Sequence, residues 1–139
     1  MSKNFLLLLS VFWLSCGHQN KTGQLTDGYI TTASGLKYKI IKEGSGEPAK
    51  TGQEVLIFET VSYLNGTLLY SNENTGNPVK VLLGGNQVTA ASEEALQGMR
   101  AGEIRNLVAP ANLVKRKMYP PNLSPDSALN IRLILYKIL

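Results

Sequence analysis

Apolar and polar residues alternate along most of the chain beyond residue 35, a pattern typical of β-strands that bury one face. The clearest case is the segment 128–138, where every second residue from Leu129 to Leu135 is aliphatic while Asn130 and Arg132 occupy the other face. Such a strand should cover a core on one side and meet water on the other. Similar strand patterns occupy residues 36–40, 54–64, 67–70, 79–83 and 104–109.

Two further signals set how these strands connect. Asn65 and Gly66 lie between two apolar runs and predict a tight hairpin turn. After the fourth strand segment the apolar period becomes helical, and Glu93 and Glu94 fall in the first turn, where the helix dipole favours carboxylates. We therefore expect residues 35–139 to form one α+β domain with five or six antiparallel strands and one short helix.

The first residues follow a different pattern. Lys3 precedes an apolar run that is too short to cross a ~30 Å bilayer as a helix, so residues 1–15 are predicted to be a signal peptide. The sequence Leu14-Ser15-Cys16-Gly17 resembles the lipobox of bacterial lipoproteins, although Trp13 departs from the usual aliphatic residue. This resemblance implies that Cys16 carries lipid and anchors the chain to a membrane of the bacterial cell envelope, facing the periplasm or the cell exterior. The alternatives are an ordinary signal peptide followed by a chance cysteine, or an uncleaved N-terminal anchor.

Residues 16–34 are polar and have no sustained apolar period, so they are predicted to be the lipidated cysteine and a flexible tether. The only histidine of the chain, His18, lies in this segment, where a lone histidine is more often solvated than functional. With 14 Lys and Arg residues against 10 Asp and Glu, the chain is only mildly basic. This charge is too weak to predict a nucleic-acid partner.

The residue types of the domain exclude several kinds of catalysis. The only cysteine and the only histidine precede it, and the whole chain has two aspartates, so nucleophile–histidine–acid catalysis and Cys/His zinc sites are not expected. No metal or cofactor is predicted. Catalysis would have to use shape, apolar surroundings and backbone hydrogen bonds. Rotation about an X–Pro bond suits these means, because its barrier of roughly 20 kcal/mol arises from amide resonance and no proton need move.

A series of short motifs runs through residues 35–139 in the order Gly52-Gln53, Asn65-Gly66, Pro78, Gly84, Val88, Glu93-Glu94-Ala95-Leu96, Gly98-Met99-Arg100-Ala101-Gly102, Arg105-Asn106-Leu107, Pro110 and Ser124-Pro125-Asp126-Ser127-Ala128-Leu129. The order of these motifs resembles the FKBP family over essentially all of this range. The resemblance implies an FKBP-like fold, a twisted antiparallel sheet wrapped on one short helix, and peptidyl-prolyl cis-trans isomerase activity.

The substrate pocket implied by this resemblance differs from the family pattern. In the family, aromatic residues surround the proline ring over a tryptophan floor. Here Glu59 stands for the first tyrosine, Leu69 and Tyr70 for a Phe-Asp pair, Val79 for a phenylalanine, Thr89 for an isoleucine, Ser92 for the tryptophan, Lys115 for a tyrosine and Ile131 for a phenylalanine. Only Val88 is the usual residue. Serine cannot provide the contact area of a buried tryptophan, so prolyl affinity should be weak.

The alternation of the 54–64 segment directs Glu59 toward the core or the pocket, where an unpaired carboxylate is costly. One hypothesis is a polar cluster of Glu59, Tyr70 and Lys115 in place of the aromatic site. The alternative is that a local bulge turns Glu59 to solvent and that Lys115 is simply solvated.

A long proline-containing loop is expected over residues 111–127. It includes Lys115-Arg116-Lys117, followed by Met118 and Tyr119. These cations could contact anionic lipid headgroups or an acidic partner. Charge runs more often mark solvated surface, with Tyr119 packing on the core or refilling the pocket.

Two functions follow from these observations. The first is a prolyl-isomerase-like folding factor for exported proteins, weakly active, which binds proline-containing polypeptides in a shallow groove of Leu69, Val79, Val88 and Ile131. The second is a noncatalytic FKBP-like module, tethered to a membrane, that binds a peptide or an envelope protein in the altered cleft.

Overall fold

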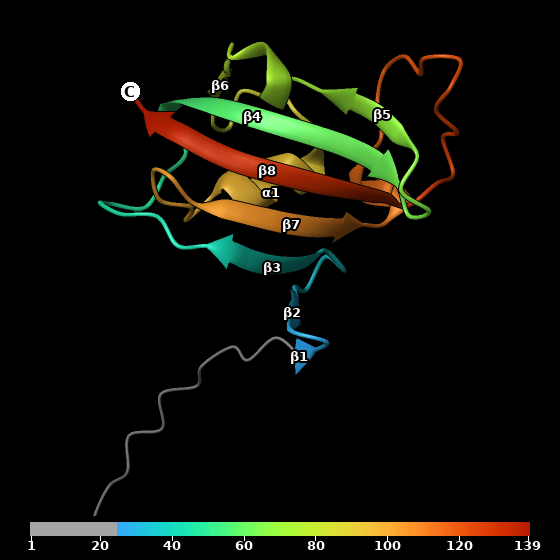
Figure 1. Cartoon of the computed structure of the whole chain (residues 1–139), viewed down its shortest axis with the longest axis horizontal. Coiled ribbons are helices and arrows are strands. Elements are labelled where there is room, and N and C mark those ends of the chain that lie inside the picture. Colours follow the sequence, from blue (N-terminus) through green and yellow to red (C-terminus); the bar gives the residue numbers. More distant parts are fainter. Residues whose placement is uncertain (1–24) are drawn as a thin grey trace, which may run out of the picture.

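The computed structural model describes residues 25–139, so the predicted signal peptide, Cys16 and the predicted tether up to residue 24 lie outside the described residues. Eight strands form one antiparallel sheet in the order β1-β2-β3-β7-β8-β4-β5, and β6 pairs with β4 (Figure 1). The strands are β1 (Leu25–Thr26), β2 (Tyr29–Thr31), β3 (Lys37–Lys42), β4 (Glu54–Tyr63), β5 (Leu68–Ser71), β6 (Val79–Leu82), β7 (Ile104–Ala109) and β8 (Leu129–Ile138).

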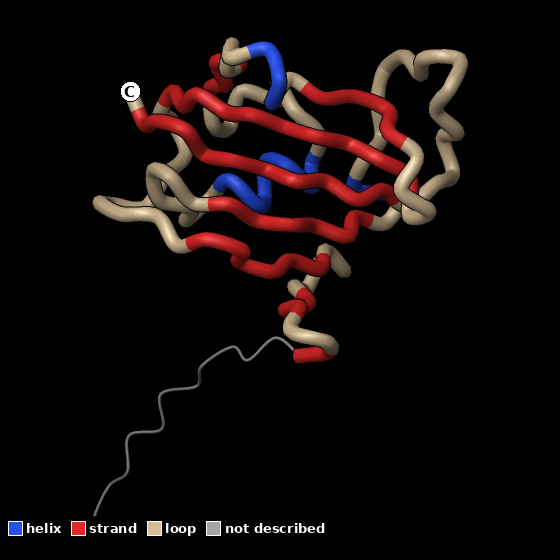
Figure 2. The backbone as a smooth tube through the Cα atoms, viewed as in Figure 1, coloured by secondary structure: helices blue, strands red, loops and turns tan. Residues whose placement is uncertain are grey.

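Within residues 25–139 a single α-helix, α1 (Ala90–Leu96), packs behind the sheet, and one-turn 3-10 helices follow β5 and β7 at Glu73–Thr75 and Ala111–Leu113 (Figure 2). The core lies between α1 and the sheet. Every second residue of β8 from Leu129 to Leu135 is buried in this core, as the alternation predicts. Leu96 of α1 and Met99 after it are fully buried as well. The predicted α+β fold of an antiparallel sheet and one short helix is confirmed, and its six predicted strands correspond to β3 through β8.

The two additional strands, β1 and β2, lie in the segment that the sequence assigns to the tether. Ile30 of β2 pairs with Tyr38 of β3, which adds a short hairpin to the edge of the sheet. Asp27 and Gly28 form its turn with positive φ values of 55° and 78°. Paired strands therefore begin before residue 35, the predicted start of the domain. With only two and three residues, these strands are too short to give a clear alternation in the sequence.

Strand β4 changes its pairing partner along its length, and this positions the site described below. One edge of β4 pairs with β8 from Val55 to Tyr63, with a bulge between Leu56 and Ile57. The other edge pairs first with β6, up to Ile57, and then with β5, from Thr60 onward. Neither strand covers the backbone between these two stretches, so another group must bind it there.

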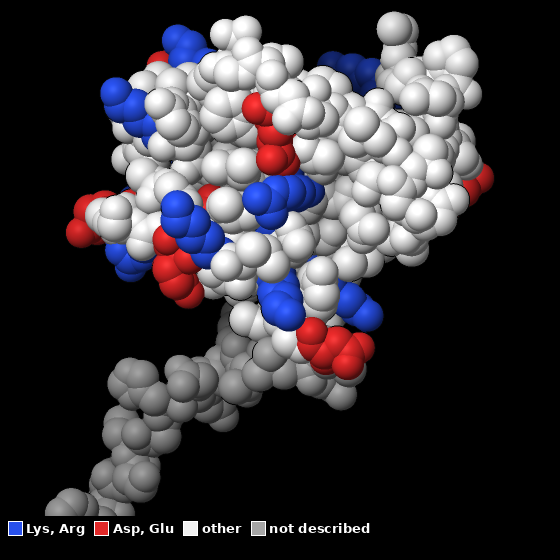
Figure 3. Space-filling view, in the orientation of Figure 1, with Lys and Arg blue, Asp and Glu red and all other residues white. Residues whose placement is uncertain are grey.

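The face of the sheet opposite α1 carries Lys, Arg, Asp and Glu side chains close to one another rather than in a patch of one sign (Figure 3). Within residues 25–139, no helix has the length and apolar character needed to cross a membrane.

Candidate functional site

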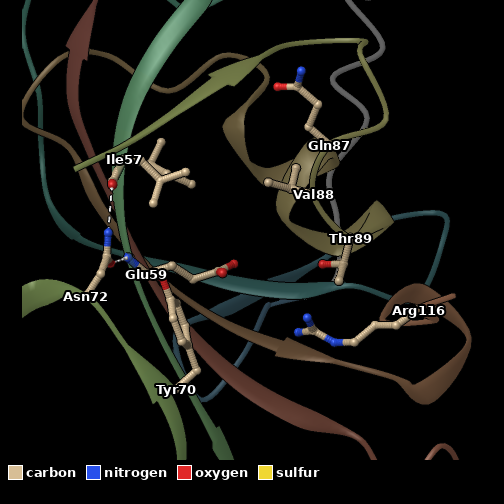
Figure 4. Close-up of a pocket in the computed structure, with 9 residues that line it drawn as sticks. Ile57, Glu59, Tyr70, Asn72, Gln87, Val88, Thr89 and Arg116 are labelled. Atoms are coloured by element: carbon tan, nitrogen blue, oxygen red, sulfur yellow. Dashed lines mark hydrogen bonds between the residues drawn. The ribbon is translucent and has the colours of Figure 1, made fainter. Parts of the chain in front are cut away.

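A cleft opens where β4 changes partner, between β5, β6 and the loop that enters α1. Its cavity has a volume of about 230 Å³. The lining residues are Ile57, Glu59, Tyr70, Asn72, Val79, Gln87, Val88, Thr89 and Arg116 (Figure 4). Apolar side chains from β4, β6 and the loop before α1 form part of the wall. Charged groups enter from two sides, a carboxylate from β4 and a guanidinium from the loop after β7.

Asn72 occupies the gap between the two partners of β4 and fixes this part of the wall. Its Oδ1 accepts a hydrogen bond from the Glu59 backbone N–H at 2.7 Å, and its Nδ2 donates to the Ile57 carbonyl at 3.3 Å (Figure 4). The Asn72 backbone N–H also donates to the Glu59 carbonyl at 3.2 Å. Asn72 is buried, with 6% of its surface exposed. Its hydrogen bonds replace those that a neighbouring strand would make to the β4 backbone at this point.

The Glu59 carboxylate points across the cleft toward the start of α1 (Figure 4). Its Oε1 accepts a hydrogen bond at 2.7 Å from the Ser92 hydroxyl, which is fully buried in the first turn of the helix. The Thr89 hydroxyl donates to Ser92 Oγ at 3.2 Å and accepts from the Ser92 backbone N–H at 3.4 Å. Thr89 thereby caps the helix. The two hydroxyl groups form a chain that ends on one oxygen of the carboxylate.

The side chains that line the cleft are apolar, amide, hydroxyl and charged groups, and no cysteine, histidine or serine is among them. Within residues 25–139, no group of three histidine, cysteine, aspartate or glutamate residues is placed to hold a metal ion.

Comparison with known proteins identifies the family to which the chain belongs. A model of the family described as FKBP-type peptidyl-prolyl cis-trans isomerase matches residues 45–133, which contain the whole cleft. The chain belongs to this family.

Relatives of this FKBP-type chain include plant and bacterial proteins. The peptidyl-prolyl cis-trans isomerase FKBP19 of Arabidopsis chloroplasts is 34% identical over 113 residues, which are 73% of this chain and 43% of the relative. The probable FKBP-type isomerase FkpA of Neisseria meningitidis is 31% identical over 119 residues, 85% of this chain and 43% of the relative. The chain thus spans less than half the length of these two relatives. The crystal structure of Escherichia coli FkpA matches with a TM-score of 0.71 at 26% identity, covering 81% of this chain and 52% of that one.

Of the nine FKBP pocket positions predicted from the sequence, the structure brings five together in the cleft: Glu59, Tyr70, Val79, Val88 and Thr89. The other four lie elsewhere. Ser92 is buried beneath Glu59, and Leu69 packs partly buried against the core. Ile131 is a core residue of β8 with 1% of its surface exposed. Lys115 lies in the loop beside the cleft and lines a neighbouring groove instead.

The hypothesis of a Glu59, Tyr70 and Lys115 cluster does not describe the contacts seen here. Among the described residues, no hydrogen bond or ion pair joins Glu59 to either of these partners, and its carboxylate is bound by Ser92 instead. Glu59 does not turn to solvent either, because it is half-buried and lines the cleft. The register shifts of β4 lie on either side of Glu59, between Leu56 and Ile57 and between Val61 and Ser62.

Four lining residues were not among those predicted: Ile57, Asn72, Gln87 and Arg116. Ile57 shares the inward face of β4 with Glu59, so strand alternation could have identified it. Arg116 follows Lys115 directly, but a loop has no period that tells which of two neighbours faces inward. Asn72 gives no signal in the sequence, since its role depends on the gap between β5 and β6.

The loop over residues 111–127, called the flap from here on, is held by contacts at its base and middle. Val114 is buried, and the Tyr119 hydroxyl accepts a hydrogen bond from the Arg116 backbone N–H at 3.2 Å. Tyr119 packs against the core rather than lining the cleft. Met118 is 84% exposed.

Proposed function

We propose that this chain is an FKBP-type peptidyl-prolyl isomerase of weak activity that acts on proline-containing segments of exported polypeptides. The observation that supports this function is the cleft, with Ile57, Val79 and Val88 in its wall, in a chain of the FKBP-type family. Apolar surroundings stabilise the twisted imide relative to the polar planar one, and no proton transfer is required. The chain needs only to bind the proline ring and exclude water.

Two features support weak rather than full activity. The tryptophan floor implied by family resemblance is replaced by Ser92, which is buried under the cleft and presents no ring for contact. Glu59 adds a carboxylate to the wall that the proline ring would have to desolvate. Because proline has no N–H, it cannot pair with that carboxylate, and each unpaired polar group costs roughly 1–3 kcal/mol.

A proline-limited refolding assay on the full chain tests this function. We expect the chain to accelerate the slow refolding phase of a substrate protein above the rate in buffer. Val79→Glu should abolish the acceleration, because it places a second carboxylate on the cleft wall at a position where 45% of the side chain is exposed and the fold tolerates a polar group. Leu82→Glu is the matched control, being the same kind of change on the same strand outside the cleft, with 37% exposed. Refolding no faster than in buffer at high concentrations of the chain would reject isomerase activity.

The hydrogen bond between Ser92 and Glu59 favours a second candidate, a noncatalytic peptide-binding module. It makes part of the cleft floor polar where catalysis calls for a dry apolar surface. Under this alternative, proline-containing peptides would shift the NMR signals of Val79 and Val88 while the chain leaves their cis-trans exchange rate unchanged. Binding together with faster exchange would reject the alternative.

We further propose that the chain acts in the bacterial cell envelope, attached to a membrane through lipid on Cys16. The support is the resemblance of Leu14-Ser15-Cys16-Gly17 to a lipobox behind an apolar run. When the gene is expressed in a bacterium, the protein should fractionate with membranes and incorporate labelled fatty acid, and Cys16→Ala should remove both properties. Labelling that persists in Cys16→Ala would contradict lipidation at this residue.

A further inference from the structure

A second cavity of about 530 Å³ adjoins the cleft on the side of the flap. Its lining residues are Asn86, Gln87, Val88, Thr89, Lys115, Arg116 and Lys117. Four of these, Gln87, Val88, Thr89 and Arg116, also line the cleft. The two cavities therefore share an edge, so a polypeptide bound in the cleft can continue into the second one. We call this second cavity the basic groove.

The basic groove carries the three positive charges of Lys115, Arg116 and Lys117. Its other lining side chains are two amides, a valine and a threonine, and no carboxylate lines it among residues 25–139. The ion pairs of that part of the chain involve none of Lys115, Arg116 or Lys117. The nearby acidic residues of α1 are bound elsewhere, since Glu93 accepts from the Gly84 N–H and Glu94 from Ser34. A carboxylate from a ligand could therefore pair with the cations of this groove.

The cleft has the opposite character on its inner side. Glu59 places a negative charge there, and among residues 25–139 its only side-chain hydrogen-bond donor is the neutral Ser92 hydroxyl. Arg116 also lines the cleft, but at the edge that the cleft shares with the basic groove. An acidic ligand side chain is therefore repelled from the inner cleft and attracted to the groove beside it. The pair of cavities should select both the residues of a ligand and their register.

We propose that the polypeptides recognised by this chain carry acidic side chains next to the proline, with the proline in the cleft and the acidic residues in the basic groove. This inference rests on the proposed function, because it takes the cleft as the site of the prolyl residue. Electrostatic attraction of this kind raises the association rate and the selectivity for acidic ligands more than it raises overall affinity.

Binding of matched proline peptides to the full chain, followed by NMR titration, tests the proposal. One peptide carries glutamate on both sides of the proline and the other carries glutamine, so that the two differ only in charge. At low ionic strength the glutamate peptide should bind roughly three to ten times more tightly, as two or three exposed charge pairs allow. The preference should shrink near 0.15 M salt, where the Debye length is about 8 Å.

The triple variant Lys115→Gln/Arg116→Gln/Lys117→Gln should lose this preference. The matched control is Lys42→Gln/Lys50→Gln/Lys137→Gln, which removes the same charge from three exposed lysines that line neither cavity. We expect the control to keep most of the preference. Equal affinity of the wild-type chain for both peptides, or equal loss in the two triple variants, would overturn the proposal.

Two further readouts separate this inference from its alternatives. Cis-trans exchange of the bound peptides reports on isomerase activity, so acidic preference without faster exchange would reject the isomerase function while upholding the groove. The second readout is binding to vesicles of phosphatidylserine and of phosphatidylcholine, measured by co-sedimentation. If the flap triple variant loses binding to the anionic vesicles while peptides show no charge preference, the groove is a membrane contact and the proposal is wrong.

Discussion

Two glutamates link the helix α1 region to the sheet, and they differ in how their carboxylates are bound. Glu103, directly before β7, has only 2% of its surface exposed. Its Oε1 pairs with Arg105 Nε at 2.5 Å, and its Oε2 accepts from the Arg100 backbone N–H at 2.9 Å. Both of its oxygens are therefore satisfied by protein donors, one of them charged.

Glu59 is the contrasting case. It is half-buried on β4, and the Ser92 hydroxyl binds one of its oxygens. No cation of residues 25–139 pairs with it. Because its carboxylate lines the cleft, a ligand can reach it, which is not so for Glu103. We therefore assign the Glu103 carboxylate to the stability of the fold and the Glu59 carboxylate to ligand binding.

Arg105, the partner of Glu103, makes further contacts that hold this ion pair inside the protein. Its guanidinium also donates to the Ala95 carbonyl near the end of α1 at 3.0 Å and lies over the Tyr38 ring at 4.9 Å. The Glu103 and Arg105 pair thus joins the helix end to β7 and β3. Removing one charge would leave the other nearly buried without its partner.

Of the substitutions considered, breaking the ion pair between Glu103 and Arg105 should lower stability most. We expect Glu103→Gln to lower the free energy of unfolding by about 4 kcal/mol, because it leaves the Arg105 guanidinium without a counter-charge. Urea unfolding measures this as a lower midpoint at an unchanged slope. Peptide affinity of the folded fraction should not change. A loss below about 1 kcal/mol would show that solvent screens this pair.

Ile131 tests the boundary between core and cleft. The structure places it in the core with 1% exposed, although family resemblance implies a pocket residue. Ile131→Ala should cost about 3 kcal/mol of stability through the cavity that it leaves. Proline-peptide affinity, measured by NMR titration at a temperature where the variant is folded, should stay within twofold of wild type. A large loss of affinity with little loss of stability would instead assign Ile131 to the cleft.

Asn72 lies between these extremes, since it is buried yet lines the cleft. Asn72→Ala leaves the Glu59 N–H and the Ile57 carbonyl without this partner, and we expect a loss of about 2 kcal/mol. Asn77→Ala is the matched control, because Asn77 is exposed and only its backbone takes part in hydrogen bonds. Thermal unfolding of the two variants compares them directly. Equal stability of the two would contradict the bridging role of Asn72.

The sequence predicted the sheet better than the cleft, for a physical reason. Alternation is strong where a strand buries one face along its whole length, as β8 does between Leu129 and Leu135. The short strand β2 contributes a single aliphatic residue, Ile30, and gave no such signal. Only its pairing with β3 reveals it.

The cleft depends on contacts that no sequence pattern carries. Resemblance to the family located Glu59 and Val88, but it could not show that Ser92 would bind the Glu59 carboxylate across 33 positions of sequence. It also named Lys115, whereas the flap directs Arg116 into the cleft. In a loop the direction of each side chain is set by individual contacts, here including the bond between the Arg116 N–H and Tyr119.

The most direct test of the contrast between the two glutamates is Glu59→Gln, which should change stability by less than about 1 kcal/mol, because glutamine can still accept from Ser92. Proline-limited refolding should then compare the full chain with this variant. We predict that the wild-type chain accelerates refolding weakly and that Glu59→Gln accelerates it roughly fivefold more, because a neutral amide costs less to desolvate against a proline ring. Equal rates for the two chains, or a slower rate for Glu59→Gln at equal stability, would contradict this account of the cleft.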